Sequence, residues 1–123
     1  MILGLDISTS ITGWTVADFA GNVIEYGAWD TRKYKDFFDK AEAVSKGVTE
    51  IHIQYGGKIK HVYIEQSLQT FRSGFSSAKT LSSLSRFNGI VSWLIYHLFQ
   101  IKPEYIAATS ARKHCGIKIP RGE

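Results

Sequence analysis

Two carboxylates set among apolar residues are the side chains of this sequence best suited to chemistry. Asp6 lies within the run ILGLDIS, and Glu65 follows the apolar part of HVYIEQ. A charged group inside an apolar strand is costly unless it is paired, hydrogen-bonded or bound to a metal. Each residue alone has a simpler role, because Asp6 could cap the turn that follows it and Glu65 could be a surface charge at a strand end. Together they predict a shared site.

A shared site requires that the strands carrying Asp6 and Glu65 lie side by side, so that residues distant in the sequence converge. Two buried carboxylates at one point repel each other, and a cation between them removes this penalty. Mg2+ is the natural counterion, with Mn2+ as a substitute, because hard divalent ions take carboxylate oxygens and water as ligands. We therefore predict that Asp6 and Glu65 are metal ligands and catalytic residues.

The elements that must position these two residues follow from the spacing of the apolar residues. The pattern predicts five strands, with the sequences ILGLDIS, WTVADF, VIEYGAWD, HVYIEQ and EYIAA. The first three are joined by short turns and should form an antiparallel meander. Helical spacing predicts an amphipathic helix from Tyr34 to about Ile53 and a second helix from about Ser77 to Phe99. The order is β-β-β-α-β-α-β, an α/β fold with a mixed five-stranded sheet.

Composition and charge narrow the possible classes of protein. The chain has 123 residues, of which 44% are hydrophobic, so one domain with a single core is expected. It contains neither an apolar run of about 18 residues nor a basic segment leading into a long apolar one, so we expect an intracellular protein without a membrane partner. The single cysteine, Cys115, excludes an internal disulfide. A net charge of +4 is compatible with a polyanionic partner.

Around Asp6 and Glu65 the sequence resembles the RuvC-like Holliday junction resolvases of the RNase H-like superfamily, especially those of phages and large DNA viruses. The run ILGLDISTSITGW has Asp6 at the position of the family's first acidic ligand, and VYIEQ has Glu65 at the position of the second. The other segments that carry the resemblance are SSAKTLSSLSRFNGIV and ATSARKH. The resemblance covers nearly the whole chain, which would then be a single RuvC-like nuclease domain.

The resemblance implies a Mg2+-dependent crossover junction endodeoxyribonuclease, in the bacterial cytoplasm or a virus-infected host cell. Such an enzyme acts as a homodimer on four-way or otherwise branched DNA, and two cations roughly 3.5 to 4 Å apart assist the phosphodiester hydrolysis. The family carries four carboxylates, the third and fourth on a C-terminal helix. This sequence ends at PRGE, where that helix would begin. We therefore expect residues 1–123 to be a C-terminally truncated domain that lacks this helix and holds an incomplete acidic site.

The hydroxyl residues that follow Asp6 are candidates for DNA contact. Ser8, Thr9 and Ser10 could line the site and position a phosphate of the DNA. Ser and Thr after a strand are usually turn formers, so the two roles compete here. Basic residues are further candidates for phosphate contacts, although a solvated surface explains them equally well, and these are Lys79, Arg86, Arg112 and Lys113.

Aromatic residues in the segment SLQTFRSGFS are candidates for base stacking. The segment is polar, contains glycine and is long enough to suggest a function. Phe71 and Phe75 lie on either side of Arg72 and could stack on unpaired bases at the centre of a junction. Packing of these rings into the core is the alternative.

The helix from about Ser77 carries more large apolar residues than one buried face usually needs. Trp93, Tyr96 and Phe99 lie around its main apolar stripe. We therefore expect part of this helix to be shared with a second copy of the chain, whose two-fold symmetry would match a four-way junction.

Two other functions remain open. One is a non-catalytic module of the same fold that binds branched DNA without cutting it. The other follows from LDISTSITG, which is also similar to the phosphate-1 loop of actin-like sugar kinases and Hsp70-type ATPases, where a strand Asp and the following hydroxyls hold Mg2+ and nucleotide phosphates. Those enzymes place the nucleotide between two lobes, and this chain supplies one. A calorimetric test for ATP binding distinguishes this function from the others.

Overall fold

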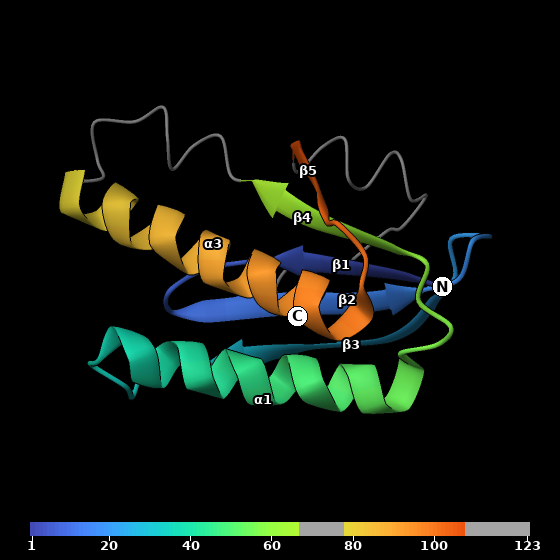
Figure 1. Ribbon diagram of the computed structural model, residues 1–123, viewed down its shortest axis with the longest axis horizontal. Coiled ribbons are helices and arrows are strands. Elements are labelled where there is room, and N and C mark those ends of the chain that lie inside the picture. Colours follow the sequence, from blue (N-terminus) through green and yellow to red (C-terminus); the bar gives the residue numbers. More distant parts are fainter. Residues whose placement is uncertain (67–77, 108–123) are drawn as a thin grey trace.

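The computed structural model describes residues 1–66 and 78–107, and in these ranges it contains five strands and two helices in the expected order (Figure 1). The strands are β1 (Ile2–Asp6), β2 (Ile11–Ala17), β3 (Val23–Asp30), β4 (His61–Gln66) and β5 (Glu104–Ala107). The helices are α1 (Phe37–Tyr55) and α3 (Ala78–Phe99). Among the described residues, no helix is long and apolar enough to cross a membrane.

The strands form one mixed sheet in the order β3-β2-β1-β4-β5. The pairs β1–β2 and β2–β3 are antiparallel, which confirms the predicted meander. The pairs β1–β4 and β4–β5 are parallel, which confirms that the first and fourth strands are neighbours. Strand β2 begins at Ile11, earlier than the predicted WTVADF, because its ladder with β3 extends to the pair Ile11 and Asp30.

Helix α1 begins at Phe37, later than the predicted Tyr34, because Asp36 caps it. The Asp36 carboxylate accepts hydrogen bonds from the backbone N–H groups of Phe38 and Asp39, at 2.9 and 3.1 Å. The extended backbone of Asp36 (φ −80°, ψ 135°) turns the chain into the helix. The helix then continues to Tyr55, past the predicted end.

Both helices cover the same face of the sheet, with α1 and α3 side by side (Figure 1). Alternate strand residues face these helices and are fully or almost fully buried, among them Leu3, Leu5, Val16, Val62 and Ile64. The helices contribute Val44, Val48, Phe87, Val91 and Ile95 to the same core. Because side chains alternate along a strand, Asp6 and Glu65 lie on the opposite face, which we call the open face.

A pair of tryptophans joins the meander to α1. Trp14 of β2 and Trp29 of β3 stack with ring centroids 6.1 Å apart and an interplanar angle of 22°. Each ring lies over a glycine: a Cβ added at Gly27 would lie 2.8 Å from Trp14 Cζ2, and one added at Gly47 of α1 would overlap Trp29 Cε2. The absence of side chains at these two positions therefore lets the rings pack between the strands and the helix.

Candidate functional site

The two carboxylates singled out in the sequence occupy directly opposite positions on neighbouring strands. Asp6 is the last residue of β1 and is in register with Glu65 of the parallel strand β4. Neighbouring strands lie about 4.8 Å apart, and residues in register project from the same face. Both side chains therefore extend from the open face, at the end of the sheet where β1 and β4 terminate. This register brings the backbones of Asp6 and Glu65 side by side, as the predicted shared site requires.

The surroundings of these carboxylates differ from the sequence expectation in one respect. Asp6 is exposed and Glu65 is half-buried, whereas an apolar run suggested buried charges. The reason is that Asp6 ends its strand on the face away from the helices, where water reaches it. Solvent screens the repulsion between two carboxylates and lowers the cost of keeping both charged.

The donor set formed by Asp6 and Glu65 fits a hard divalent ion in part. Mg2+ in proteins often binds through one or two carboxylates and completes its shell with water and substrate phosphates. Among the described residues, no group of three or more His, Cys, Asp or Glu side chains lies close enough together to hold a metal ion. The described part of the chain thus offers two acidic ligands of the right chemical type and no third.

Residues 7–10, which we call the 7–10 turn, connect β1 to β2 directly after Asp6. The Thr12 hydroxyl accepts a hydrogen bond from Ser8 N (3.2 Å) and donates one to Ser8 O (3.0 Å). The Ser8 and Ser10 hydroxyls lie 2.9 Å apart, and Ser10 N donates to Ser8 Oγ at 3.2 Å. These contacts support the turn-forming role of the hydroxyl residues, and the predicted phosphate contact stays a prediction.

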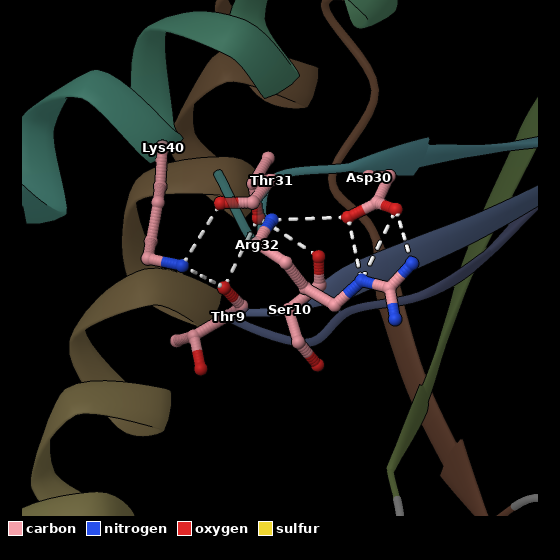
Figure 2. Close-up of polar contacts among 6 residues, drawn as sticks. All are labelled: Thr9, Ser10, Asp30, Thr31, Arg32 and Lys40. Carbon is pink, nitrogen blue, oxygen red and sulfur yellow. Dashed lines mark hydrogen bonds and ion pairs between the residues drawn. The ribbon is translucent and has the colours of Figure 1, made fainter. Parts of the chain in front are cut away.

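Two residues that the sequence pattern did not single out hold this turn against the rest of the protein (Figure 2). Thr31, directly after β3, is 1% exposed, and its hydroxyl lies 3.0 Å from both Thr9 O and Ser10 O. Lys40 reaches from α1 and donates to Thr9 O at 2.7 Å and to Thr31 O at 3.0 Å. One lysine in an amphipathic helix and one threonine after a strand carry no local signal of such contacts.

An ion pair lies at the end of β3, beside these contacts. The Arg32 guanidinium binds both carboxylate oxygens of Asp30, with Nη2 2.6 Å from Oδ2 (Figure 2). Hydrogen bonds from the Arg32 side chain and backbone lower the pKa of Asp30 to about 2, and the charge of Lys40 acts in the same direction. Both partners are largely exposed, so the pair adds little to stability.

The basic candidates that the structure describes lie on α3. Lys79 and Arg86 are both exposed. The Arg86 guanidinium lies over the Phe37 ring, 5.8 Å from its centroid, so part of its role is packing on the first turn of α1. Other candidates lie outside the described residues, namely Phe71, Arg72, Phe75, Arg112 and Lys113.

The aromatic residues expected at a shared helix surface divide into two groups. Trp93 and Tyr96 are 58% and 42% exposed, and the Trp93 ring stacks on His97 with centroids 4.8 Å apart. Phe99 is buried, with its ring in edge contact with His52 of α1. The expectation was therefore wrong for Phe99, because α1 covers that side of the helix.

Comparison with known proteins gives no sequence relative, since neither a protein-family model nor a curated protein matches. Among solved structures, the chain is similar to RuvC of Thermus thermophilus, with 12% identity and a TM-score of 0.69 over 99% of this chain and 84% of RuvC. The same protein in complex with a Holliday junction substrate gives 9% identity and a TM-score of 0.72 over 91% of this chain and 67% of that one.

A third similar structure is the inorganic polyphosphate/ATP-glucomannokinase of Arthrobacter sp. strain KM. It has 17% identity and a TM-score of 0.55, over 93% of this chain but 46% of the kinase. Identities this low establish the fold alone. The element order and the sheet order β3-β2-β1-β4-β5 are those of the RNase H-like fold, which confirms the predicted fold class.

Proposed function

We propose that this chain is the nuclease domain of a structure-selective endonuclease that resolves four-way or branched DNA junctions, and that Asp6 and Glu65 bind its catalytic Mg2+. The observation that carries this proposal is the register of Asp6 with Glu65 on the open face of the sheet. The similarity to RuvC over 99% of the chain supports it, and one of the RuvC structures holds a Holliday junction substrate.

The chemistry assigned to Asp6 and Glu65 is the holding of a divalent ion beside the scissile phosphodiester. When bound, Mg2+ or Mn2+ supplies a polarised water and stabilises the leaving oxygen. The exposure of Asp6 leaves its carboxylate accessible to a DNA strand that approaches the open face. Two carboxylates alone position an ion loosely, and a misplacement of about 1 Å can lower a rate roughly a hundredfold. We therefore expect junction binding by residues 1–123 with little cutting.

Several further residues complete the proposed DNA surface. The N-terminus of α3, where Lys79 lies, is at the same end of the molecule as the ends of β1 and β4 (Figure 1). The DNA contacts that we propose beyond the metal ligands are Ser8, Thr9, Ser10, Phe71, Arg72, Phe75, Lys79, Arg86, Arg112 and Lys113. A homodimer formed through the exposed Trp93 and Tyr96 of α3 would give the two-fold symmetry of a four-way junction.

The test compares the affinity of the protein for a four-way junction and for a linear duplex of the same length across a salt series. The junction should bind more tightly, and both affinities should fall steeply as salt rises. The Phe71→Ala and Phe75→Ala variants should lose junction preference more than duplex affinity. Lys79→Met should weaken binding more than Lys46→Met, a matched control that removes an exposed charge from α1. Equal affinity for junction and duplex at every salt concentration contradicts the proposal.

The metal ligands are tested separately by thermal unfolding with millimolar Mn2+. A ligand that binds only the folded state raises the melting temperature, weakly here because two carboxylates hold it. The Asp6→Asn variant should lose this response while keeping its affinity for the junction. An unmodified protein whose melting temperature is unchanged by Mn2+ would contradict the assignment of Asp6 and Glu65. Junction binding without a metal response favours the non-catalytic module.

A sugar-kinase or ATPase lobe is the second candidate function. The similarity to the glucomannokinase and the hydroxyl-rich turn after Asp6 favour it. The chain, however, covers less than half of that kinase, so the second wall of a nucleotide site would have to come from elsewhere. Calorimetry with Mg2+ and ATP should show no binding, and a saturable heat would favour the kinase lobe over the nuclease.

A further inference from the structure

The hydrogen bonds between the 7–10 turn, Thr31 and Lys40 converge on two backbone carbonyls. Thr9 O accepts from Lys40 Nζ, Ser10 O accepts from Thr31 N (2.8 Å), and the Thr31 hydroxyl, with one hydrogen to donate, lies 3.0 Å from both carbonyls. Figure 2 shows Thr9 O directed toward the Lys40 ammonium and Thr31, and Ser10 O directed toward Thr31. Two side chains from different elements therefore fix the direction of two consecutive peptide groups.

The Lys40 ammonium is not placed as a surface lysine usually is. Its side chain is half-buried, and its hydrogen bonds go to the neutral carbonyls of Thr9 and Thr31. Hydrogen bonds from an ionised donor are stronger than neutral ones, and the interaction gains strength where water is partly excluded. The hydrogen bonds of Lys40 therefore favour one position of the 7–10 turn relative to α1.

The position of this turn is coupled to Asp6 through a short and well-anchored piece of backbone. Ile7, the residue between Asp6 and Ser8, is buried in the core. Ser8 is held from both sides by the Thr12 hydroxyl. With Thr9 and Ser10 fixed by the contacts described above, the backbone after Asp6 has no unanchored residue that could absorb a displacement. A shift of the turn would therefore move the end of β1.

The geometry points to Lys40 and Thr31 as positioning residues for the metal ligand Asp6. This inference rests on the proposed metal site of Asp6 and Glu65. Neither residue contacts the metal or the DNA in this role: they hold the turn so that the Asp6 carboxylate stays opposite Glu65. Removing a residue that orients a metal ligand lowers metal affinity about 10- to 100-fold. The effect here passes through backbone, so we expect a decrease of about threefold to tenfold.

The experiment uses Mn2+ alone and follows the paramagnetic broadening of backbone amide signals in the unmodified protein and in folded variants. In the unmodified protein, signals around Asp6 and Glu65 should broaden first. Lys40→Met and Thr31→Val should require about threefold to tenfold more Mn2+ for the same broadening. Thr31→Ser, which keeps the hydroxyl, should restore the response. Lys46→Met removes an exposed charge from the same helix and should leave the response unchanged.

The outcomes separate the two claims. If the unmodified protein shows no broadening near Asp6 and Glu65, the proposed metal site itself is wrong. If that broadening is present and is the same in Lys40→Met and Thr31→Val, the metal site stands and the positioning role is overturned. Should Lys40→Met fail to fold, the pair Thr31→Val and Thr31→Ser decides, because valine has nearly the shape of threonine without its hydroxyl, whereas serine keeps the hydroxyl and loses only the methyl group.

Discussion

Substitution of Gly47 by alanine tests how tightly the tryptophan pair ties the meander to α1. The new Cβ would overlap the indole ring of Trp29, which cannot move away freely because it stacks on Trp14 and Trp14 lies against Gly27. Overpacking of this kind typically costs about 1 to 3 kcal/mol. Alanine in a helix interior recovers about 1 kcal/mol relative to glycine. The net loss of stability should therefore be at most about 2 kcal/mol, a decrease in Tm of at most roughly 10 °C.

The matched control is Gly89→Ala in α3, where an added Cβ has no neighbour within 4 Å among residues 1–66 and 78–107. This variant has the same gain in helix propensity and no clash, so it should be stabilised by about 0.5 to 1 kcal/mol. The stabilities of the Gly47→Ala and Gly89→Ala variants are measured by thermal and urea unfolding at low protein concentration. In a Trp29→Leu background, Gly47→Ala should become stabilising, because the indole ring that the new Cβ would overlap is no longer present. If Gly47→Ala raises the Tm of the unmodified protein as Gly89→Ala does, the packing argument is refuted.

Three further expectations concern the helix cap, an ion pair and the helix surface. Asp36→Ala should lower the free energy of unfolding by about 1 kcal/mol in urea titrations, whereas Asp36→Asn should retain most of it. Arg32 lowers the pKa of Asp30 to about 2, below its unfolded value, so the small stabilisation is complete above about pH 4 and is lost as the pH falls toward 2; Asp30→Asn should flatten this end of the pH–stability curve. Trp93→Glu should shift the mass from dimer to monomer in light scattering, and an unmodified chain that is monomeric at every concentration would contradict a shared α3 surface.

The order of the strands along the chain and the face on which each carboxylate lies could be predicted because their signals are local. Apolar and polar residues alternate along β1 and β4, and this pattern identifies which residues share a face. The pairing of Asp6 with Glu65 then follows once the two strands are adjacent. The exposure of Asp6 could not be read from the same pattern. It depends on which face of the sheet the helices cover, and the alternation within a strand does not say that both helices pack on the face opposite Asp6.

The contacts of Lys40 and Thr31 illustrate what a sequence leaves undetermined. Lys40 bonds a carbonyl 31 positions away, and the choice of partner depends on the distance between α1 and the sheet. Phe99 is a similar case, because the apolar stripe of α3 is wide and its pattern does not say which edge of the stripe α1 covers. The spacing of apolar residues identifies the apolar stripe of a helix, whereas the helix or strand packed against it decides which residues of that stripe become buried.

The parallel pairing of β1 with β4 also has a consequence for folding. The meander β1–β2–β3 is built from neighbouring segments and can form early, whereas β4 pairs with β1 across the whole segment from β2 to α1, and β5 adds to the outer edge of β4. Closing so long a loop is entropically unfavourable and slow compared with forming a hairpin. Asp6 and Glu65 therefore meet only at this late step. A partly folded chain has its hairpins but no paired carboxylates, so the proposed metal binding by Asp6 and Glu65 should select the completed sheet.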